Sequence, residues 1–172
     1  MVASLSANPD FRFCPKCGSE LARKVVKANE PPRLVCSGCE FILFEDPKLA
    51  AGTLFRYEGK LVLLKRAIEP GYGKWVFPGG FVDRGERVVD AAIRETLEES
   101  GVVVETRGLI DVYSATGSPI VVVVYRAEIV SGEPRAADET LEVGLFDTSE
   151  VPWDNLAFPS TTQALQTYLS NE

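Results

Sequence analysis

The sequence predicts an α/β domain preceded by a small cysteine-rich segment. Three observations support this class: strand-like apolar runs alternate with two helix-like segments, every cysteine lies within the first 39 residues, and 45% of the 172 residues are hydrophobic while 25% are charged. This composition excludes a disordered or collagen-like chain. We expect residues 1–10 to form a flexible tail, residues 11–46 a small cysteine-rich domain and residues 47–172 the α/β domain.

The four cysteines form two CxxC pairs, which are Cys14, Cys17, Cys36 and Cys39. Two such pairs can bring four thiolates to one tetrahedral ion, and Gly18 and Gly38 allow the tight turns that the pairs need. Because a segment this short cannot fold by hydrophobic burial alone, we expect a structural zinc ion to hold it together. The alternative is two disulfides or a redox CxxC, but neither a secretory signal nor a thioredoxin-like βαβ pattern accompanies the cysteines.

From Leu49 onward the apolar residues follow strand-like patterns. Residues 50–57 and 60–67 are joined at Glu58-Gly59, which predicts a β-hairpin, and residues 68–80 form a loop rich in glycine and proline. The valine run within 120–129 predicts a strand that is buried on both faces. The strands expected beyond the loop are Val102–Glu105, Leu109–Tyr113, Ile120–Ile129 and Val143–Phe146.

Two segments have the periodicity of amphipathic helices. The first runs from Glu86 to Ser100 and should end at Gly101, a residue suited to the left-handed position after a helix. The second runs from Ser160 to Leu169, where Ser160 and Gln163 fit a capping box.

Charge and histidine content exclude several classes of function. The chain has 18 Lys and Arg against 25 Asp and Glu, a net charge of −7 that disfavours non-specific binding to nucleic acid or to an anionic membrane. It contains no histidine, which excludes Ser-His-Asp and Cys-His catalysis and a histidine-bound catalytic zinc. Proton transfer must therefore use carboxylates, amines, phenols or metal-bound water. Since no signal peptide or membrane-spanning run is evident, a cytoplasmic location without a membrane partner is expected.

Three glutamates cluster on the first helix. Glu95, Glu98 and Glu99 lie at i, i+3 and i+4, where like charges repel by about 0.2–0.5 kcal/mol per pair. A hard divalent cation such as Mg²⁺, which prefers oxygen ligands, would convert this repulsion into a binding site. Just upstream, Gly79 and Gly80 offer backbone that can approach both metal and substrate, so Gly80 is a candidate substrate contact. Taken alone, three glutamates are more often a solvated acidic face, and that alternative stays open at this point.

The wider spacing around these glutamates resembles the Nudix box. Over 23 residues, eight positions match in identity and spacing: Gly80, Glu86, Arg94, Glu95, Glu98, Glu99, Gly101 and Val102. Thr96 is the single departure, since the box has an aliphatic residue there. A pattern that fixes so many positions is highly specific.

The resemblance implies the Nudix fold, an α/β/α sandwich around a mixed sheet. It also implies hydrolysis of a nucleoside diphosphate linked to another moiety, with Mg²⁺ or Mn²⁺ bound by box glutamates and by the carbonyl of Gly79. By this resemblance Glu95 and Glu99 are the principal metal ligands and Glu98 is a further ligand or the base that activates water. Arg94 positions Glu95.

Other site residues are expected outside the box. Family members often recruit one more acid from a later loop, for which Glu139 is our candidate and Glu142 its rival. The anionic substrate requires local cations, for which Arg66 and Lys74 are candidates. Tyr72 lies between glycines and is the candidate for stacking on an aromatic ring of the substrate.

A four-cysteine zinc ribbon before the box is similar to that of the NADH pyrophosphatase branch and of a branch of FAD and ADP-ribose pyrophosphatases. The SQPWPFP-type segment usual in the NADH branch is missing, because residues 113–125 read YSATGSPIVVVVY. Residues Leu156 to Thr161, LAFPST, are similar to a segment of the FAD-type branch. FAD, cleaved to FMN and AMP, or ADP-ribose is therefore the expected substrate, with NADH as the alternative.

The resemblance also implies a homodimer. Alternatives from another class are a nucleotide sensor that has lost hydrolysis and a ribbon that binds RNA through its basic residues. The sensor is disfavoured because the box glutamates, which such sensors usually lose, are all present.

Overall fold

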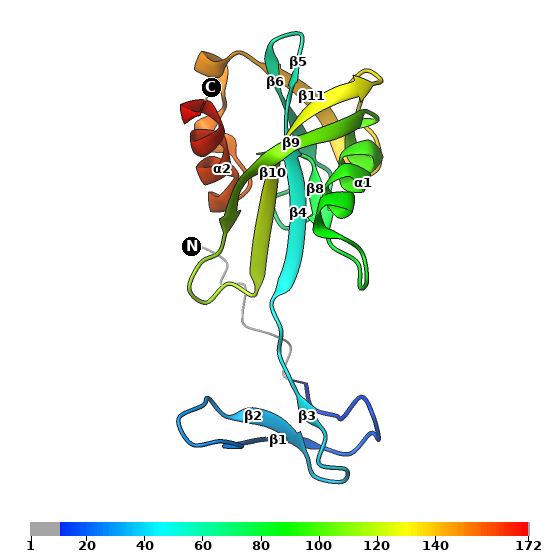
Figure 1. Ribbon diagram of the computed structural model, residues 1–172, viewed down its shortest axis with the longest axis vertical. Coiled ribbons are helices and arrows are strands. Elements are labelled where there is room, and N and C mark those ends of the chain that lie inside the picture. Colours follow the sequence, from blue (N-terminus) through cyan, green and yellow to red (C-terminus); the bar gives the residue numbers. More distant parts are fainter. Residues whose placement is uncertain (1–10, 172) are drawn as a thin grey trace. The chain divides into compact units, whose positions relative to one another are not determined.

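The structure is a computed structural model that describes residues 11–171 (Figure 1). The tail predicted at residues 1–10 lies outside the described residues. The chain divides into two compact units, one that runs to Pro47 and includes Gly117–Pro119, and one that comprises Lys48–Thr116 and continues from Ile120. No helix within residues 11–171 is long and apolar enough to cross a lipid bilayer.

The larger unit is an α/β/α sandwich, as expected. Its first sheet has the order β8-β4-β10-β9 and is mixed, because β4 runs parallel to β10 while the other pairs are antiparallel. Its second sheet has the order β11-β6-β5, and β7 also pairs with β6. The strands are β4 (Lys48–Leu54), β5 (Arg56–Tyr57), β6 (Lys60–Arg66), β7 (Trp75–Val76), β8 (Gly79–Phe81), β9 (Val103–Tyr113), β10 (Ile120–Ser131) and β11 (Thr140–Phe146).

Helices α1 (Val88–Ser100) and α2 (Pro159–Ser170) lie on opposite sides of these sheets (Figure 1). Successive residues of β6 show why both faces are apolar. Leu61 and Leu63 pack in the cluster that contains Leu165 of α2, whereas Val62 packs in the cluster against Ile93 of α1. The core therefore has two halves, one under each helix.

The predicted hairpin is only partly formed. Strand β5 pairs with the start of β6 across a turn in which Glu58 and Gly59 have φ values of 50° and 80°, as the tight hairpin turns require. Strand β4 ends at Leu54, before this turn, and pairs with β8 and β10 instead. The sequence pattern predicted two strands, but it did not show that the first would pair with strands distant in sequence.

The segment 68–80, predicted as a loop, contains the short strands β7 and β8. Gly52 of β4 makes this pairing feasible: a Cβ there would lie 2.7 Å from the ring of Phe77. Without that Cβ, the segment reaches β4, and Thr53 donates its N–H to the carbonyl of Pro78 at 3.0 Å. Residues 79–80 thereby become part of the first sheet.

Two further strand predictions need correction. The strands expected at 102–105 and 109–113 form the single strand β9, because β-bulges opposite β10 absorb the intervening residues. The valine run of β10 is fully buried only at Val124, while residues 121–123 are half-buried. Burial on both faces therefore holds only for part of that strand.

The ends of α1 follow local chemistry. The helix ends as predicted at Gly101, whose φ is 71° and whose N–H donates to the carbonyl of Leu97 at 2.9 Å. It begins at Val88 rather than Glu86, because Glu86 closes a turn by donating its N–H to the carbonyl of Asp83. Glu86 thus lies just outside the helix.

The capping box predicted for α2 is wrong. The helix begins at Pro159, with Phe158 as the N-cap residue and no side-chain hydrogen bond to the cap. Proline has a fixed φ and lacks an N–H, so it suits the first helical position and places Ser160 inside the first turn. Ser160 cannot then serve as the cap.

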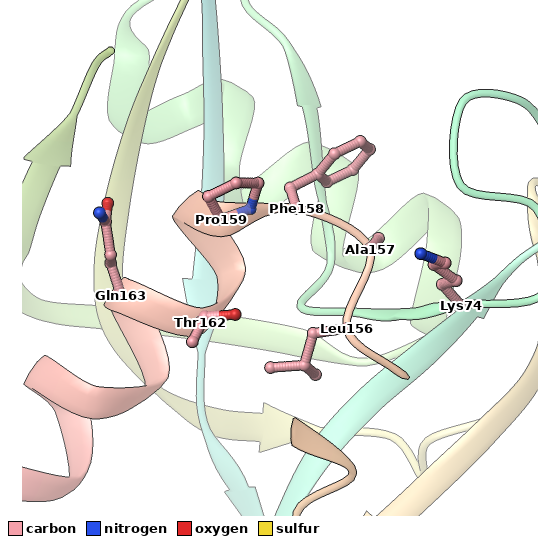
Figure 2. A pocket seen from close by; sticks show the side chains of 7 residues that line it. All are labelled: Lys74, Leu156, Ala157, Phe158, Pro159, Thr162 and Gln163. Carbon is pink, nitrogen blue, oxygen red and sulfur yellow. The ribbon is translucent and has the colours of Figure 1, made fainter. Parts of the chain in front are cut away.

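The segment before α2 lines an open cleft of about 500 Å³ (Figure 2). Ala157 donates its N–H to the carbonyl of Trp75 at 2.8 Å, which ties this segment to β7. The residues that line the cleft are Lys74, Leu156, Ala157, Phe158, Pro159, Thr162 and Gln163. The first four residues of the LAFPST segment, 156–159, are among them.

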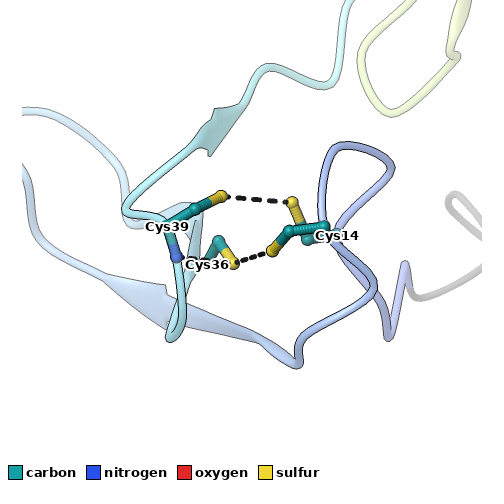
Figure 3. A group of neighbouring side chains, drawn as sticks. Cys14, Cys36 and Cys39 are labelled. Carbon is teal, nitrogen blue, oxygen red and sulfur yellow. Dashed lines mark hydrogen bonds between the residues drawn. The ribbon is translucent and has the colours of Figure 1, made fainter.

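The smaller unit is a three-stranded antiparallel sheet with a cluster of cysteines. Its strands are β1 (Leu21–Lys24), β2 (Arg33–Cys36) and β3 (Ile42–Leu43). The four Sγ atoms lie within 4.8 Å of one another, with 3.8 Å between Cys14 and Cys39 and 3.4 Å between Cys17 and Cys36 (Figure 3). Four thiolates about 2.3 Å from one tetrahedral ion would stand about 3.8 Å apart. The cluster therefore fits zinc.

Backbone groups favour charged sulfur in this cluster. The N–H groups of Lys16 and Gly38 point at the sulfur atoms of Cys14 and Cys36 at 3.4 and 3.3 Å. Gly18 has the expected left-handed φ of 76°, whereas Gly38 is needed for a different reason, since a Cβ there would meet the side chain of Ser19. Four thiolates without a cation would repel, so a divalent ion is the natural occupant.

Removal of zinc should unfold the small unit and spare the large one, because only the small unit depends on the cysteine cluster. After treatment with a chelator, ¹⁵N–¹H spectra should lose the dispersed signals of residues 11–46 and retain those of residues 47–171. Loss of all dispersed signals would contradict the predicted domain limits. If the cysteines formed disulfides instead, a chelator would change nothing and a reductant would unfold the unit.

Candidate active site

Helix α1 packs against β4 and β8 and holds two of its glutamates against the glycines of β8. Glu99 is only 7% exposed, and its carboxylate accepts the N–H of Gly79 at 2.9 Å. A Cβ at Gly80 would lie 2.6 Å from Oε1 of Glu95, so any other residue there would push this carboxylate from its place. The backbone of Gly79 and Gly80 thus lies close to both carboxylates.

Burial changes the acid–base properties of these two groups. The pKa of Glu99 is raised to about 7: loss of solvent is the largest cause and the charges of Glu95 and Glu139 act in the same direction, while the N–H of Gly79 and the charge of Arg66 oppose the shift. Burial likewise raises the pKa of Glu95, against the hydrogen bond from Arg94. A cation between the two carboxylates would offset both penalties.

Arg94 organises the outer side of the cluster. Its Nε and Nη2 donate to the two carboxylate oxygens of Glu86 at 2.9 and 3.0 Å, and its Nη1 donates to Glu95 at 2.8 Å and to Glu98 at 2.9 Å. Nη2 also reaches the carbonyl of Phe81 at 3.2 Å. The hydrogen bond from Arg94 holds the pKa of Glu86 below its usual value. Arg94 therefore restrains two of the three clustered glutamates at once.

Glu98 differs from its neighbours because it faces solvent. Its side chain is 46% exposed, against 15% for that of Glu95. A carboxylate in that place can exchange protons with water. Within residues 11–171 the four cysteines are the one group of three or more side chains gathered closely enough to hold an ion, and the glutamates of α1 form no such group.

Glu139 and its rival Glu142 occupy different surroundings. The charge of Glu139 contributes to the raised pKa values of both Glu95 and Glu99. Glu142 instead forms an exposed ion pair with Lys65 at 3.0 Å.

Backbone hydrogen bonds explain the position of Glu139. Its carbonyl accepts the N–H of Ala67, just after β6, at 2.8 Å. Four and two residues earlier, the N–H groups of Arg135 and Ala137 donate to the carbonyls of Ser100 and Glu99 at the end of α1. The segment is thus attached at both ends to elements that carry the site.

Of the predicted substrate contacts, Lys74 lines the cleft and Arg66 lies beside Phe158, one of its lining residues. Arg66 donates from Nε to the carbonyl of Pro70 at 2.9 Å, and its guanidinium lies 5.2 Å from the ring centroid of Phe158. Its charge also lowers the pKa of Glu99. Tyr72 is 58% exposed, whereas Lys74 lines the cleft (Figure 2).

Sequence reasoning gave no role to two residues that the structure brings into the site. Glu86 matched the box, but only the structure shows that the turn at residues 83–86 places its carboxylate where it accepts hydrogen bonds from Arg94. Phe158 is remote in sequence from Arg66, and its only signal was the LAFPST resemblance.

Comparison with known proteins agrees with this geometry. A NUDIX domain model matches residues 46–165, and a model described as Nudix N-terminal, a zinc ribbon, matches residues 12–45. The chain is 29% identical over 145 residues to an ADP-ribose pyrophosphatase of Methanocaldococcus jannaschii, a match covering 82% of this chain and 80% of the relative. It is 29% identical over 112 residues to an NAD-capped RNA hydrolase of Schizosaccharomyces pombe, covering 55% and 28% of the two chains.

Among solved structures, a NUDIX hydrolase from Nitrosomonas europaea superposes with a TM-score of 0.87 and 37% identity, covering 94% of this chain and 92% of that one. The two family models together span nearly the whole of the described chain. The chain, a zinc ribbon followed by a catalytic domain, therefore belongs to the Nudix family of hydrolases.

Proposed function

We propose that this Nudix enzyme hydrolyses the diphosphate bridge of ADP-ribose, giving AMP and ribose 5-phosphate. The observation that carries hydrolysis is the pair of buried carboxylates, Glu95 and Glu99, held against the glycine backbone of β8. The choice of ADP-ribose is supported by the M. jannaschii relative of that name. FAD is the second candidate, because residues 156–159 of the LAFPST segment, which is similar to that of the FAD-type branch, line the cleft.

The donor set fits a hard divalent cation. We propose that Glu95, Glu99 and the carbonyl of Gly79 hold Mg²⁺ or Mn²⁺, with Glu139 as a further ligand. Every one of these donors is oxygen, which is what such ions prefer. When bound, an ion of this kind neutralises the negative charge of the diphosphate and lowers the pKa of a bound water.

The remaining chemistry falls to residues of this chain. A water oxygen forms a bond to one phosphorus, the bridging P–O bond breaks, and the leaving phosphate keeps the electron pair. Glu98, exposed to solvent, accepts the proton of the attacking water and returns it to bulk water. Arg94 keeps Glu95 and Glu98 in place while this happens.

Binding of the anionic substrate needs local positive charge in a chain of net charge −7. Arg66, whose charge acts on Glu99, is assigned to a phosphate, and Lys74 lines the cleft. Gly80 lets the substrate approach the backbone, and the exposed ring of Tyr72 is available to stack on a base.

Two more features of the protein belong to this proposal. A homodimer is what the family resemblance implies. A cytoplasmic, reducing location is supported by the four free thiols, which a zinc site requires in reduced form.

The substrate choice can be tested by product analysis. Zinc-loaded protein is incubated with Mg²⁺ or Mn²⁺ and separately with ADP-ribose, FAD, NADH and a nucleoside triphosphate. We expect AMP and ribose 5-phosphate from ADP-ribose, with kcat/KM exceeding that for NADH by about tenfold or more. Best cleavage of NADH would overturn the substrate choice. No cleavage with either metal would overturn hydrolysis and favour the nucleotide sensor.

Separate roles for the glutamates predict different effects of amide substitution. Glu98→Gln should lower kcat by about 10²–10⁴-fold while Mn²⁺ affinity is kept, because the variant loses only a proton acceptor. Glu99→Gln should instead weaken Mn²⁺ binding, measured by electron paramagnetic resonance. Glu105→Gln, which removes an exposed carboxylate paired with Arg107 at 3.0 Å, serves as the control and should change neither quantity. Equal loss of Mn²⁺ binding in the first two variants would contradict the separation of roles.

A further inference from the structure

Two buried threonines connect the helix of the site to the first sheet. Thr96 of α1 and Thr53 of β4 are each 0% exposed, and their Oγ1 atoms lie 2.7 Å apart although the residues are 43 positions apart in sequence. Thr96 stands where the Nudix box has an aliphatic residue. A side chain that only filled space there would leave the hydroxyl of Thr53 without a partner in the core.

The direction of this hydrogen bond follows from the number of protons. The Thr96 hydroxyl lies 2.6 Å from the carbonyl oxygen of Ala92, which can only accept. Since Thr96 has one hydroxyl proton and donates it to Ala92, the proton between the two threonines must come from Thr53. Thr53 is therefore the donor and Thr96 the acceptor of the pair.

The pair is part of a closed circuit through the site. The backbone N–H of Thr53 donates to the carbonyl of Pro78 at 3.0 Å. The next residue, Gly79, donates its N–H to the carboxylate of Glu99 at 2.9 Å. Glu99 lies one turn along α1 from Thr96, which closes the circuit through helix, strand and loop.

We propose that the Thr53–Thr96 hydrogen bond is a positioning device that fixes α1 on β4 and so sets the distance from Glu95 and Glu99 to the backbone of β8. Apolar contacts are non-directional and would let the helix shift along the strand, whereas a buried hydrogen bond has a defined length and direction. The inference rests on the proposed function, because it assigns the pair to the metal site of that function. Thr53 and Thr96 are positioning residues and do not touch substrate.

The test compares Thr96→Val, Thr53→Val and the double variant in zinc-loaded protein, with Mn²⁺ affinity and urea unfolding as readouts. Thr96→Val should lower the unfolding midpoint more than Thr53→Val. Thr96→Val leaves the buried hydroxyl proton of Thr53 without an acceptor, whereas Thr53→Val leaves only a lone pair of the Thr96 oxygen unused. The double variant should recover much of the midpoint, since both hydroxyls are gone. Its Mn²⁺ affinity should nevertheless stay about tenfold weaker than that of the natural protein, as in Thr96→Val.

Two more variants separate positioning from packing. Thr96→Ser keeps the hydroxyl, so its Mn²⁺ affinity should equal that of the natural protein. This variant keeps the test decisive if Thr96→Val does not fold. Thr161→Val is the matched control: Thr161 of α2 is also 0% exposed, but its hydroxyl has no hydrogen-bond partner among residues 11–171. This change should leave Mn²⁺ affinity unaltered and the unfolding midpoint no lower.

The outcomes distinguish this inference from the function on which it rests. If the double variant recovered natural Mn²⁺ affinity together with stability, the pair would be structural only and the inference would be overturned while the metal site stood. If the natural protein bound no Mn²⁺, or Glu99→Gln bound it equally well, the proposed function would be overturned and the inference with it.

Discussion

The larger unit depends on one constraint: two carboxylates of α1 are kept largely buried and lie against the backbone of β8. Burial raises the pKa of Glu99 to about 7 and also raises that of Glu95, so the fold itself opposes the charged forms that bind a metal. Such an arrangement is unfavourable for an isolated domain and favourable once a cation arrives. The stability of this region is thus linked to what it binds.

Much of the surrounding structure serves this constraint. Gly52 lets the segment before β8 approach β4, and Gly80 leaves room for the carboxylate of Glu95. Two hydrogen bonds to Glu86 hold the guanidinium of Arg94 at the edge of the glutamate cluster. Alanines at residues 91 and 92 are 0% exposed, so the helix can lie close to the sheet. The zinc-binding unit contributes none of these contacts and is stabilised by separate chemistry.

The sequence alone predicted correctly those features that depend on local chemistry. The end of α1 at Gly101 and the cysteine cluster follow from residue types and their spacing. The proximity of Glu95 and Glu99 to Gly79 and Gly80 was implied by the resemblance to the Nudix box. Its predictions were wrong where a strand pairs with residues distant in sequence: β4 pairs with β8 and β10 instead of forming the expected hairpin. The start of α2 was also wrong, because proline at residue 159 displaces Ser160 from the cap position. Thr96 looked like a mild departure from an aliphatic residue, and nothing in the sequence indicated that Thr53 would meet it.

The most direct test of the metal site is to locate Mn²⁺ by anomalous diffraction in crystals of the zinc-loaded protein grown with MnCl₂. We predict a manganese peak bounded by the carboxylates of Glu95 and Glu99 and the carbonyl of Gly79, with zinc among the four cysteines. Manganese found only at exposed carboxylates such as Glu105, with Glu99 still bonded to the N–H of Gly79 and nothing beside it, would contradict the assignment of this cluster as the catalytic metal site.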